Sequence, residues 1–277
     1  MPKGIAVDKQ GRLKERVAMS DTNLLLTITI VVFFILYLAA VVFLGGSFTK
    51  PQNFLNILNN NASLIVLSCG MSIVMITGGI DISVGAVTCL VCMTSAVNLE
   101  RQGGNVFTVI LIGLGIGLAF GVVQGFLVAH LGIQPFIISL AGMFFAKGMT
   151  TIVSKEPIRV TNEAFLAVKD TRITVPGLGA PNKLGVYVPA YVEVGVVIAL
   201  LVVVLLFCLL RWTKLGRAFY AVGGSSQSAS MLGINVRRTK FLAHVLCSLL
   251  AGLGGILYFL HVGSGDVANG AGDEMNA

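Results

Sequence analysis

One short polar stretch interrupts the apolar sequence in the first third of the chain. From Thr77 to Gly85 it reads Thr-Gly-Gly-Ile-Asp-Ile-Ser-Val-Gly, and its Asp81 is the only charged residue between Lys50 and Glu100. An unpaired carboxylate at membrane depth is costly, so such a residue usually faces a protein interior or a water-filled cavity. A carboxylate followed closely by a hydroxyl suits either a cation or proton site or the capping of a broken helix.

Helix capping is the interpretation that we favour for this stretch. The apolar segments on its two sides, residues 62–77 and 84–98, are each short for a full membrane crossing. Broken helices are tolerated in membranes where they are buried in protein or line a cavity. We expect Asp81 and Ser83 to accept hydrogen bonds from the free N–H groups of the helix that follows. The residues expected to break the helix are Gly78, Gly79 and Gly85.

The composition is that of an integral membrane protein. Of the 277 residues 56% are hydrophobic and only 11% are charged, and the mean hydropathy is +0.91. Apolar stretches of roughly 20 residues, enough to cross a hydrocarbon core, recur along the chain. The sequence predicts an all-α, polytopic membrane protein with about seven spans, including the short broken helices around residues 77–85. The expected spans are residues 24–44, 62–77, 84–98, 105–130, 135–153, 192–210 and 241–260.

The distribution of basic residues predicts the topology. Residues 1–20 and 211–240 together hold eleven of the nineteen Lys and Arg side chains. Basic loops stay in the cytoplasm, so the net charge of +7 indicates orientation and not a nucleic-acid partner. We expect a cytoplasmic basic N-terminus at residues 1–23 and a transmembrane domain at 24–262, followed by a polar tail at 263–277. Within the domain, residues 154–190 form an external loop with some order and a docking role, and residues 211–240 form a cytoplasmic loop.

Small residues at a spacing of four predict close helix packing. Gly113, Gly117, Gly121 and Gly125 lie on one face of the fourth predicted span. Such a face lets two membrane helices approach closely.

Several kinds of chemistry are not expected. The chain has no G-x-x-x-x-G-K-[ST] loop, no H-E-x-x-H and no G-x-S-x-G, so it is neither an ATPase nor a hydrolase with these motifs. The five cysteines lie in apolar runs without ligand spacing, and His244 and His261 are isolated. We therefore expect no catalytic residue, no metal site and no cofactor.

A short helix is marked near the end of the basic loop. Ser225 or Ser226 is a plausible N-cap and Gly233 a plausible C′ residue. We expect Ala229, Met231 and Leu232 to be exposed and to dock in a groove on another subunit. The alternative is a solvated loop that lies on anionic lipid headgroups.

Several separate motifs together resemble one family, the permease subunits of bacterial ribose/xylose-type ABC importers. The similarity covers about residues 55 to 277, and it is close to the branch that handles galactofuranose-like sugars. The motifs that carry it are Gly78 to Gly85, Gln134 to Met143, Gly216 to Gly224, and Gly233-Ile234 with the basic pair that follows.

The resemblance implies an inner-membrane subunit with three kinds of protein partner. These are a second permease subunit in a homo- or heterodimer, a cytoplasmic ABC ATPase, and a periplasmic sugar-binding protein. The implied residues of the substrate path or gate are Asp81, Ser83, Asn60 and Thr77. The implied ATPase-coupling residues are Gly216, Arg217, Tyr220, Gly223, Gly224, Ala229, Met231, Leu232 and Gly233.

The resemblance also suggests a chain shortened at its C-terminus. Gly270 to Ala277 is similar to the start of the family segment G-x-G-x-E-L-D-A-I-A, after which other members continue through further membrane helices. Two alternative functions therefore stay open. One is an ion-coupled secondary carrier or channel that uses Asp81, and the other is a truncated remnant that does not transport.

Overall fold

The structure is a computed structural model that describes residues 21–45, 48–181, 186–270 and 272–277. Two units, Met1–Asn53 and Phe54–Ala277, each make their contacts mainly within themselves. The basic residues 1–20, with their predicted cytoplasmic position, lie outside the described residues.

The first unit contains the helix α1 (Asp21–Leu44). Its sequence has neither Gly nor Pro, and its large apolar side chains are exposed along most of its length. The hydroxyl groups of Thr27 and Thr29 donate to the carbonyl oxygens of Asn23 and Leu25, so they need no water. An apolar helix whose threonine hydroxyls are bonded to its own backbone is suited to lipid.

Six helices among the described residues are long and apolar enough to cross a membrane. The sequence predicted about seven spans. The difference is α3 (Val84–Arg101), which has 18 residues and carries Asn98, Glu100 and Arg101 in its last turn. The six candidate spans lie in α1, α2 (Pro51–Ile76), α4 (Val106–Ala129), α5 (Pro135–Val153), α7 (Val194–Trp212) and α10 (Val236–Val262).

The second predicted span is longer than expected. The sequence predicted a short segment from residue 62, whereas α2 begins at Pro51 and has 26 residues. The helix continues through its asparagines because their side chains find partners. Asn61 donates to the carbonyl oxygen of Ile57, and Asn59 accepts from the N–H of Glu193 at 2.9 Å. The chain therefore breaks at the end of a full-length helix.

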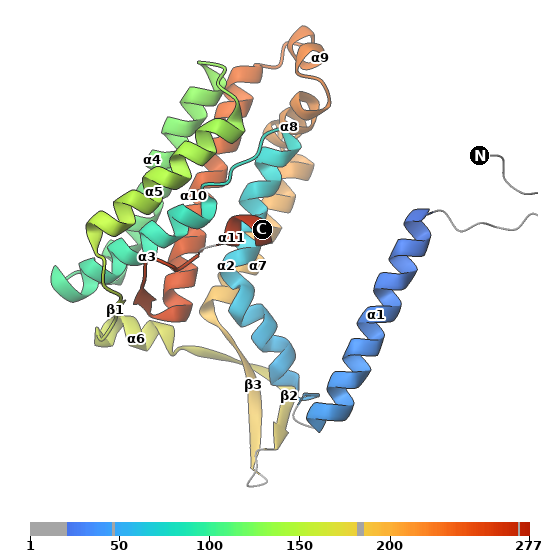
Figure 1. Cartoon of the computed structure of the whole chain (residues 1–277), viewed down its shortest axis with the longest axis vertical. Helices are drawn as coiled ribbons and strands as arrows, with labels where there is room; N and C mark the ends of the chain where they lie inside the picture. Colours follow the sequence, from blue (N-terminus) through green and yellow to red (C-terminus); the bar gives the residue numbers. More distant parts are fainter. Residues whose placement is uncertain (1–20, 46–47, 182–185, 271) are drawn as a thin grey trace, which may run out of the picture. The chain divides into compact units, whose positions relative to one another are not determined.

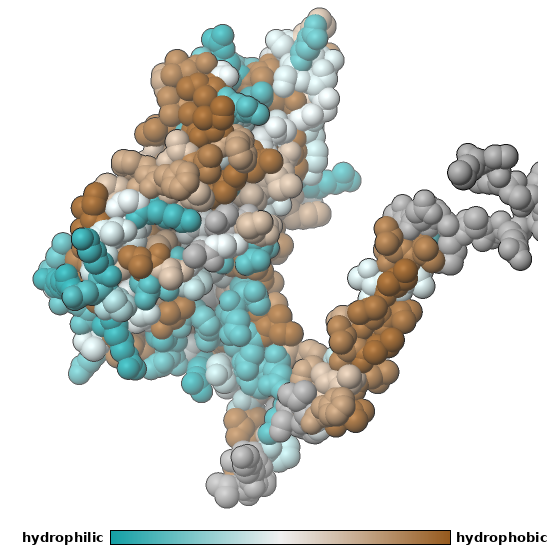
Figure 2. All heavy atoms as spheres, viewed as in Figure 1, coloured by the Kyte–Doolittle hydropathy of each residue, from teal (hydrophilic) through white to brown (hydrophobic). Residues whose placement is uncertain are grey.

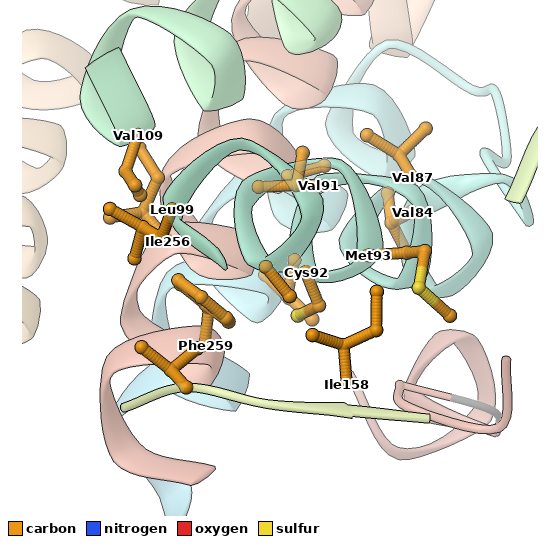
Figure 3. Packing of buried hydrophobic residues seen from close by; sticks show 14 of the residues in the cluster. Val84, Val87, Val91, Cys92, Met93, Leu99, Val109, Ile158, Ile256 and Phe259 are labelled. Carbon is orange, nitrogen blue, oxygen red and sulfur yellow. The ribbon is translucent and has the colours of Figure 1, made fainter. Parts of the chain in front are cut away.

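The α3 helix lies in the core of the second unit. It packs against α10, α5 and α4, and most of its residues are buried. Figure 3 shows Val84, Val87, Val91, Cys92 and Met93 among side chains from its neighbours. These neighbours include Ile256 and Phe259 of α10, Val109 of α4 and Ile158 of the strand β1 (Ile158–Arg159). The motif at residues 77–85 thus leads directly into the most buried helix.

Two strand pairs and one short helix cover one end of the second unit. The strands β2 (Arg172–Pro181) and β3 (Tyr187–Glu193) form an antiparallel hairpin, and β1 pairs with β4 (Ser264–Gly265). The helix α6 (Glu163–Lys169) lies between β1 and β2 in the sequence. The predicted external loop thus contains a hairpin that the sequence analysis did not identify. Figure 1 shows this hairpin and the helices α8 (Lys214–Gly224) and α9 (Ser226–Met231) at opposite ends of the unit.

Two acidic residues, Glu100 and Glu193, make side-chain contacts at the end of the second unit that carries the strands. Glu100 accepts from the N–H and hydroxyl of Thr161, both at 2.7 Å, and from the N–H of Asn162 at 3.0 Å. Nδ1 of His261 lies 2.7 Å from Oε2 of Glu193, so His261 is not isolated as the sequence suggested.

The segment after α10 packs along α3 and is not a free polar tail. A side chain at Gly265 would lie 2.8 Å from Cβ of Ala96, and one at Gly270 would lie 2.9 Å from the carbonyl oxygen of Gly85. The segment therefore follows α3 from its last turns back to its first turn, and ends in the short helix α11 (Asp273–Asn276). Its glycines make this close approach possible, a signal that composition alone does not reveal.

Candidate functional site

Asp81 lies at the centre of a buried polar network. Its side chain has 0% exposure, and its Oδ1 accepts from the N–H of Ser83 at 3.0 Å and from the hydroxyl of Ser83 at 2.6 Å. The side-chain amide of Gln124 in α4 in turn donates to Oγ of Ser83 at 2.9 Å. The network joins the break between α2 and α3 to α4.

The capping expectation is wrong for Ser83. Ser83 is the N-cap residue of α3, but its side chain makes no capping hydrogen bond. Its backbone already has helical angles, and its hydroxyl is directed to Asp81. An N-cap side chain usually needs an extended backbone to reach the N–H groups of the first turn. Asp81 therefore fixes Ser83, the N-cap residue, through two hydrogen bonds, and α3 begins at the next residue, Val84.

Two residues of α10 complete the surroundings of Asp81. Cys247 and His244 are both buried and both lie within electrostatic reach of the Asp81 carboxylate. The sequence analysis treated His244 as isolated and Asp81 as nearly alone, because 163 positions separate these two residues in the sequence. A polar residue on the small-residue face of α10 was the available signal. The sequence reasoning also missed Gln124, a polar residue on the glycine face of α4.

Three buried polar atoms of these residues have no hydrogen-bond partner within the described part of the chain. They are Oδ2 of Asp81, Oε1 of Gln124 and Nδ1 of His244. Such atoms usually bind ordered water. The site as described contains no group of three His, Cys, Asp or Glu residues that could hold a metal ion, and the same is true of the other described residues.

The glycines of the motif at residues 77–85 lie where the backbone conformation or close neighbours leave little room for a side chain. Gly78 has φ +81°, a left-handed conformation that favours glycine, and it ends α2. A side chain at Gly79 would lie 2.9 Å from Cγ1 of Val74. Gly85 is buried in the first turn of α3, beside Gly270. The break is therefore a packed element of fixed shape.

The two other predicted path residues lie apart from the network. Asn60 is exposed on α2, whereas its neighbour Asn59 is buried and bonded to Glu193. Thr77 is buried, and its hydroxyl donates to the carbonyl oxygen of Val74. Of the predicted path residues, Ser83 is hydrogen-bonded to Asp81. Asn60 lies within α2, and Thr77 is bonded to the last turn of that helix.

An apolar cavity of about 380 Å³ lies between α4 and α5 beside the network. Gln124 lines it together with Phe120, Phe145 and Gly142. A side chain at Gly142 would overlap the amide nitrogen of Gln124, so this glycine leaves room for the bond from Gln124 to Ser83. Figure 2 shows apolar side chains gathered over α4 and α5. These faces are suited to lipid or to another membrane helix.

The four glycines of α4 lie against α10. A side chain at Gly117 would lie 2.5 Å from the carbonyl oxygen of Ser248, and one at Gly121 would lie 2.8 Å from Cα of Val245. Gly113 faces Ile256 and Gly252, and Gly125 faces Phe241 in the same way. The backbones of the two helices touch along this row, which holds Gln124 and His244 in neighbouring positions.

The α9 helix has the predicted caps but not the predicted exposure at every position. The Ser225 hydroxyl accepts from the N–H of Ser228 at 3.2 Å, and Gly233 follows the helix with φ +81°. The N-cap serine and the C′ glycine predicted for this short helix are both confirmed. Met231 and Leu232 are 78% and 80% exposed, whereas Ala229 is 1% exposed and was wrongly expected at the surface. The helix is short, so its small residue packs inward while the two large ones project outward.

The α8 helix connects α9 to the helices that are long enough to span a membrane. Phe219 is fully buried in a cluster with Ile73 and Ala243, while Arg217 and Tyr220 are exposed. Gly216 touches the carbonyl oxygens at the end of α7, and Gly223 touches that of Ile76 at the end of α2. A side chain at Gly224 would meet no described atom of another element within 4 Å.

Comparisons with known proteins agree across most of the chain. Residues 53–277 match the family model described as "Branched-chain amino acid transport system / permease component". The chain is 34% identical to the fructose import permease protein FruG of Bifidobacterium longum, over 93% of this chain and 74% of FruG. It is 33% identical to the inner membrane ABC transporter permease protein YjfF of Escherichia coli, over 94% of this chain and 75% of YjfF. The ribose import permease protein RbsC of Escherichia coli is 32% identical, over 87% of this chain and 71% of RbsC. No solved structure gives a significant match.

Proposed function

The chain belongs to the permease-component family named for the branched-chain amino acid transport system, and we propose that it is the membrane-spanning subunit of a monosaccharide ABC importer. The observation that carries this proposal is the similarity to sugar permeases over nearly the whole chain. The names of these relatives include fructose, ribose and galactofuranose. The chain supplies the path across the membrane, and a separate subunit supplies ATP hydrolysis.

The arrangement at the two ends of the second unit supports a division of partners. Exposed Met231 and Leu232, between basic residues, suit a groove on a cytoplasmic ABC ATPase. The β2–β3 hairpin at the opposite end suits a periplasmic sugar-binding protein. A second permease subunit, identical or different, completes the path. We propose a bacterial inner membrane as the location, with the N-terminus in the cytoplasm, because the positive-inside rule favours that side for the basic residues of 1–20 and 211–240.

Asp81 acts in this proposal as a fixed part of a gate and not as a sugar ligand. Its side chain is fully buried, and its known contacts are with protein groups. A carboxylate that holds the start of α3 sets the position of that helix along the path. Asn60 and Thr77 remain predictions as path residues.

Stimulation of ATP hydrolysis tests the proposed function. The permease, the ABC ATPase and the sugar-binding protein encoded with it would be reconstituted together in lipid nanodiscs. We expect ATP hydrolysis to rise when the binding protein carries its sugar, and not when the binding protein is empty. Hydrolysis that no sugar-loaded binding protein stimulates would contradict the proposal.

A further inference from the structure

The α8–α9 segment contacts another part of the second unit at the point where α2 ends. A side chain at Gly223 would overlap the carbonyl oxygen of Ile76, the last residue of α2, and would lie 3.7 Å from Cα of Thr77. We propose that Gly223 is a positioning residue through which the ATPase-docking segment moves the helix break at residues 77–85. This inference rests on the proposed function and names the contact that transmits movement within it.

The first link joins α9 to α8 without a free linker. The N–H of Ser225 donates to the carbonyl oxygen of Ala221 in α8, while its hydroxyl accepts from the N–H of Ser228 in α9. The hydroxyl of Ser226 also donates back to the carbonyl oxygen of Val222 at 3.1 Å. One residue therefore ends α8 and begins α9, so a displacement of α9 reaches α8 directly.

The second link joins α8 to the last turn of α2. Phe219 is fully buried against Ile73, and Gly223, one turn further along α8, meets Ile76. The last carbonyl groups of a helix have no partner inside that helix. A glycine lets the backbone of α8 approach such a carbonyl group closely enough for a Cα–H···O contact. The contacts with Ile73 and Ile76 both lie on the last turn of α2, and together they fix the position of α8 relative to α2.

The third link joins the end of α2 to Asp81. The N–H of Gly79 and the hydroxyl of Thr77 both donate to the carbonyl oxygen of Val74, so these residues stay attached to the last turn of α2. Asp81 follows after one further residue and is bonded to Ser83, whose partner in α4 is Gln124. Movement of the α2 end thus shifts the Asp81–Ser83 pair against α4.

Two helical glycines provide the matched test. Gly223→Ala places a methyl group against the carbonyl oxygen of Ile76, whereas a methyl group at Gly148 of α5 would meet no described atom of another element within 4 Å. Both alanine variants would be measured in the complete importer. We expect Gly148→Ala to resemble the wild type. We expect Gly223→Ala to keep the ATPase bound and active, with sugar uptake per ATP hydrolysed reduced about 5-fold or more, the range of typical coupling between sites.

Amide hydrogen exchange gives a second readout that a merely structural defect does not mimic. In the wild-type complex, binding of a non-hydrolysable ATP analogue should change exchange in α9 and also at residues 77–85. In Gly223→Ala the change should persist in α9 and disappear at 77–85. If this variant does not assemble, the wild-type exchange decides, because a nucleotide response in α9 without one at 77–85 overturns the inference.

The outcomes separate this inference from the proposed function. Equal uptake per ATP in the two alanine variants, in an importer that is active as the wild type, overturns the role of Gly223 alone. A wild-type complex without ATP-driven uptake overturns the proposed function itself.

Discussion

The hydroxyl group of Ser83 donates a hydrogen bond of 2.6 Å to Oδ1 of Asp81, and both side chains are buried. The pair stands between a 26-residue helix and the most buried helix of the protein. It therefore fixes the point where the chain passes from α2 to α3. The bond from Gln124 then fixes this point relative to α4.

The first prediction concerns the charge and the acceptor at Asp81. Asp81→Ala leaves the N–H and hydroxyl of Ser83 without their partner, and we expect a loss of about 2 to 3 kcal/mol in stability. Asp81→Asn keeps one acceptor oxygen, so the complex should still assemble. Thermal unfolding of both purified variants measures the difference. Because Asp81 does not contact sugar in this account, a changed preference between sugars in Asp81→Asn would contradict it.

The second prediction compares two glycines of α4. Gly117 touches the backbone of α10, whereas a side chain at Gly115 would meet no atom of another described element within 4 Å. Gly117→Ala should destabilise the protein by about 1 to 3 kcal/mol through overpacking. Gly115→Ala should be neutral or stabilise it by up to about 1 kcal/mol, because alanine favours the helix. Thermal unfolding in detergent measures both variants, and equal effects would refute the close contact with α10.

The third prediction concerns the exposed apolar pair Met231 and Leu232 at the end of α9. Met231→Asp combined with Leu232→Asp should weaken binding of the ABC ATPase by roughly 30-fold or more, as expected for central interface residues. The permease should remain folded, because both side chains are exposed. Co-purification and titration of the ATPase subunit measure the loss.

The matched control for this pair lies on the β2–β3 hairpin. Leu178 is an exposed apolar residue there, and Leu178→Asp should leave ATPase binding unchanged. Equal loss of binding in the control and in the double variant would argue against α9 as the docking surface.

The fourth prediction concerns the pH dependence of the link between α3 and the segment before α6. The hydroxyl and N–H of Thr161, with the N–H of Asn162, lower the pKa of Glu100 below its ordinary value of 4.5. Since the pKa is lowered by folding, the link stabilises the protein above the ordinary pKa. It is lost as the pH falls through the lower folded-state pKa.

Amide exchange at Thr161 and Asn162 measures this link. Protection should be constant from neutral pH to about pH 5 and should decrease in more acid solution, after correction for the intrinsic exchange rate. Glu100→Gln should lower the protection and remove this pH dependence, whereas Glu163→Gln should retain it. A wild-type protection that does not change with acid would contradict the role of Glu100.

Much of the fold follows from the sequence because lipid imposes simple rules. A span needs about 20 apolar residues, and this locates α1, α4, α5, α7 and α10 within a few residues. The start of α2 was missed because asparagines suggested a wetted end. The helix continues because Asn59 accepts a hydrogen bond from Glu193, which is distant in the sequence, and Asn61 donates one to Ile57 within the helix. Composition shows neither hydrogen bond.

The candidate site was only partly predictable, for the same physical reason. The glycine pair, Asp81 and Ser83 lie within one short stretch, so their proximity was evident. Gln124, His244 and Cys247 come from other helices, and their approach depends on how α4 and α10 pack. Sequence spacing reports neighbours on one helix, but it does not report which faces of two helices meet.

Sugar uptake into vesicles tests the central claim most directly. Proteoliposomes would contain the permease with its ABC ATPase, with the sugar-loaded binding protein supplied on the side of the β2–β3 hairpin and ATP on the side of α9. The account predicts uptake that requires ATP and both partner proteins, and that persists when ion gradients are abolished. Uptake that continues without the ATPase and stops when an ion gradient is abolished would contradict it.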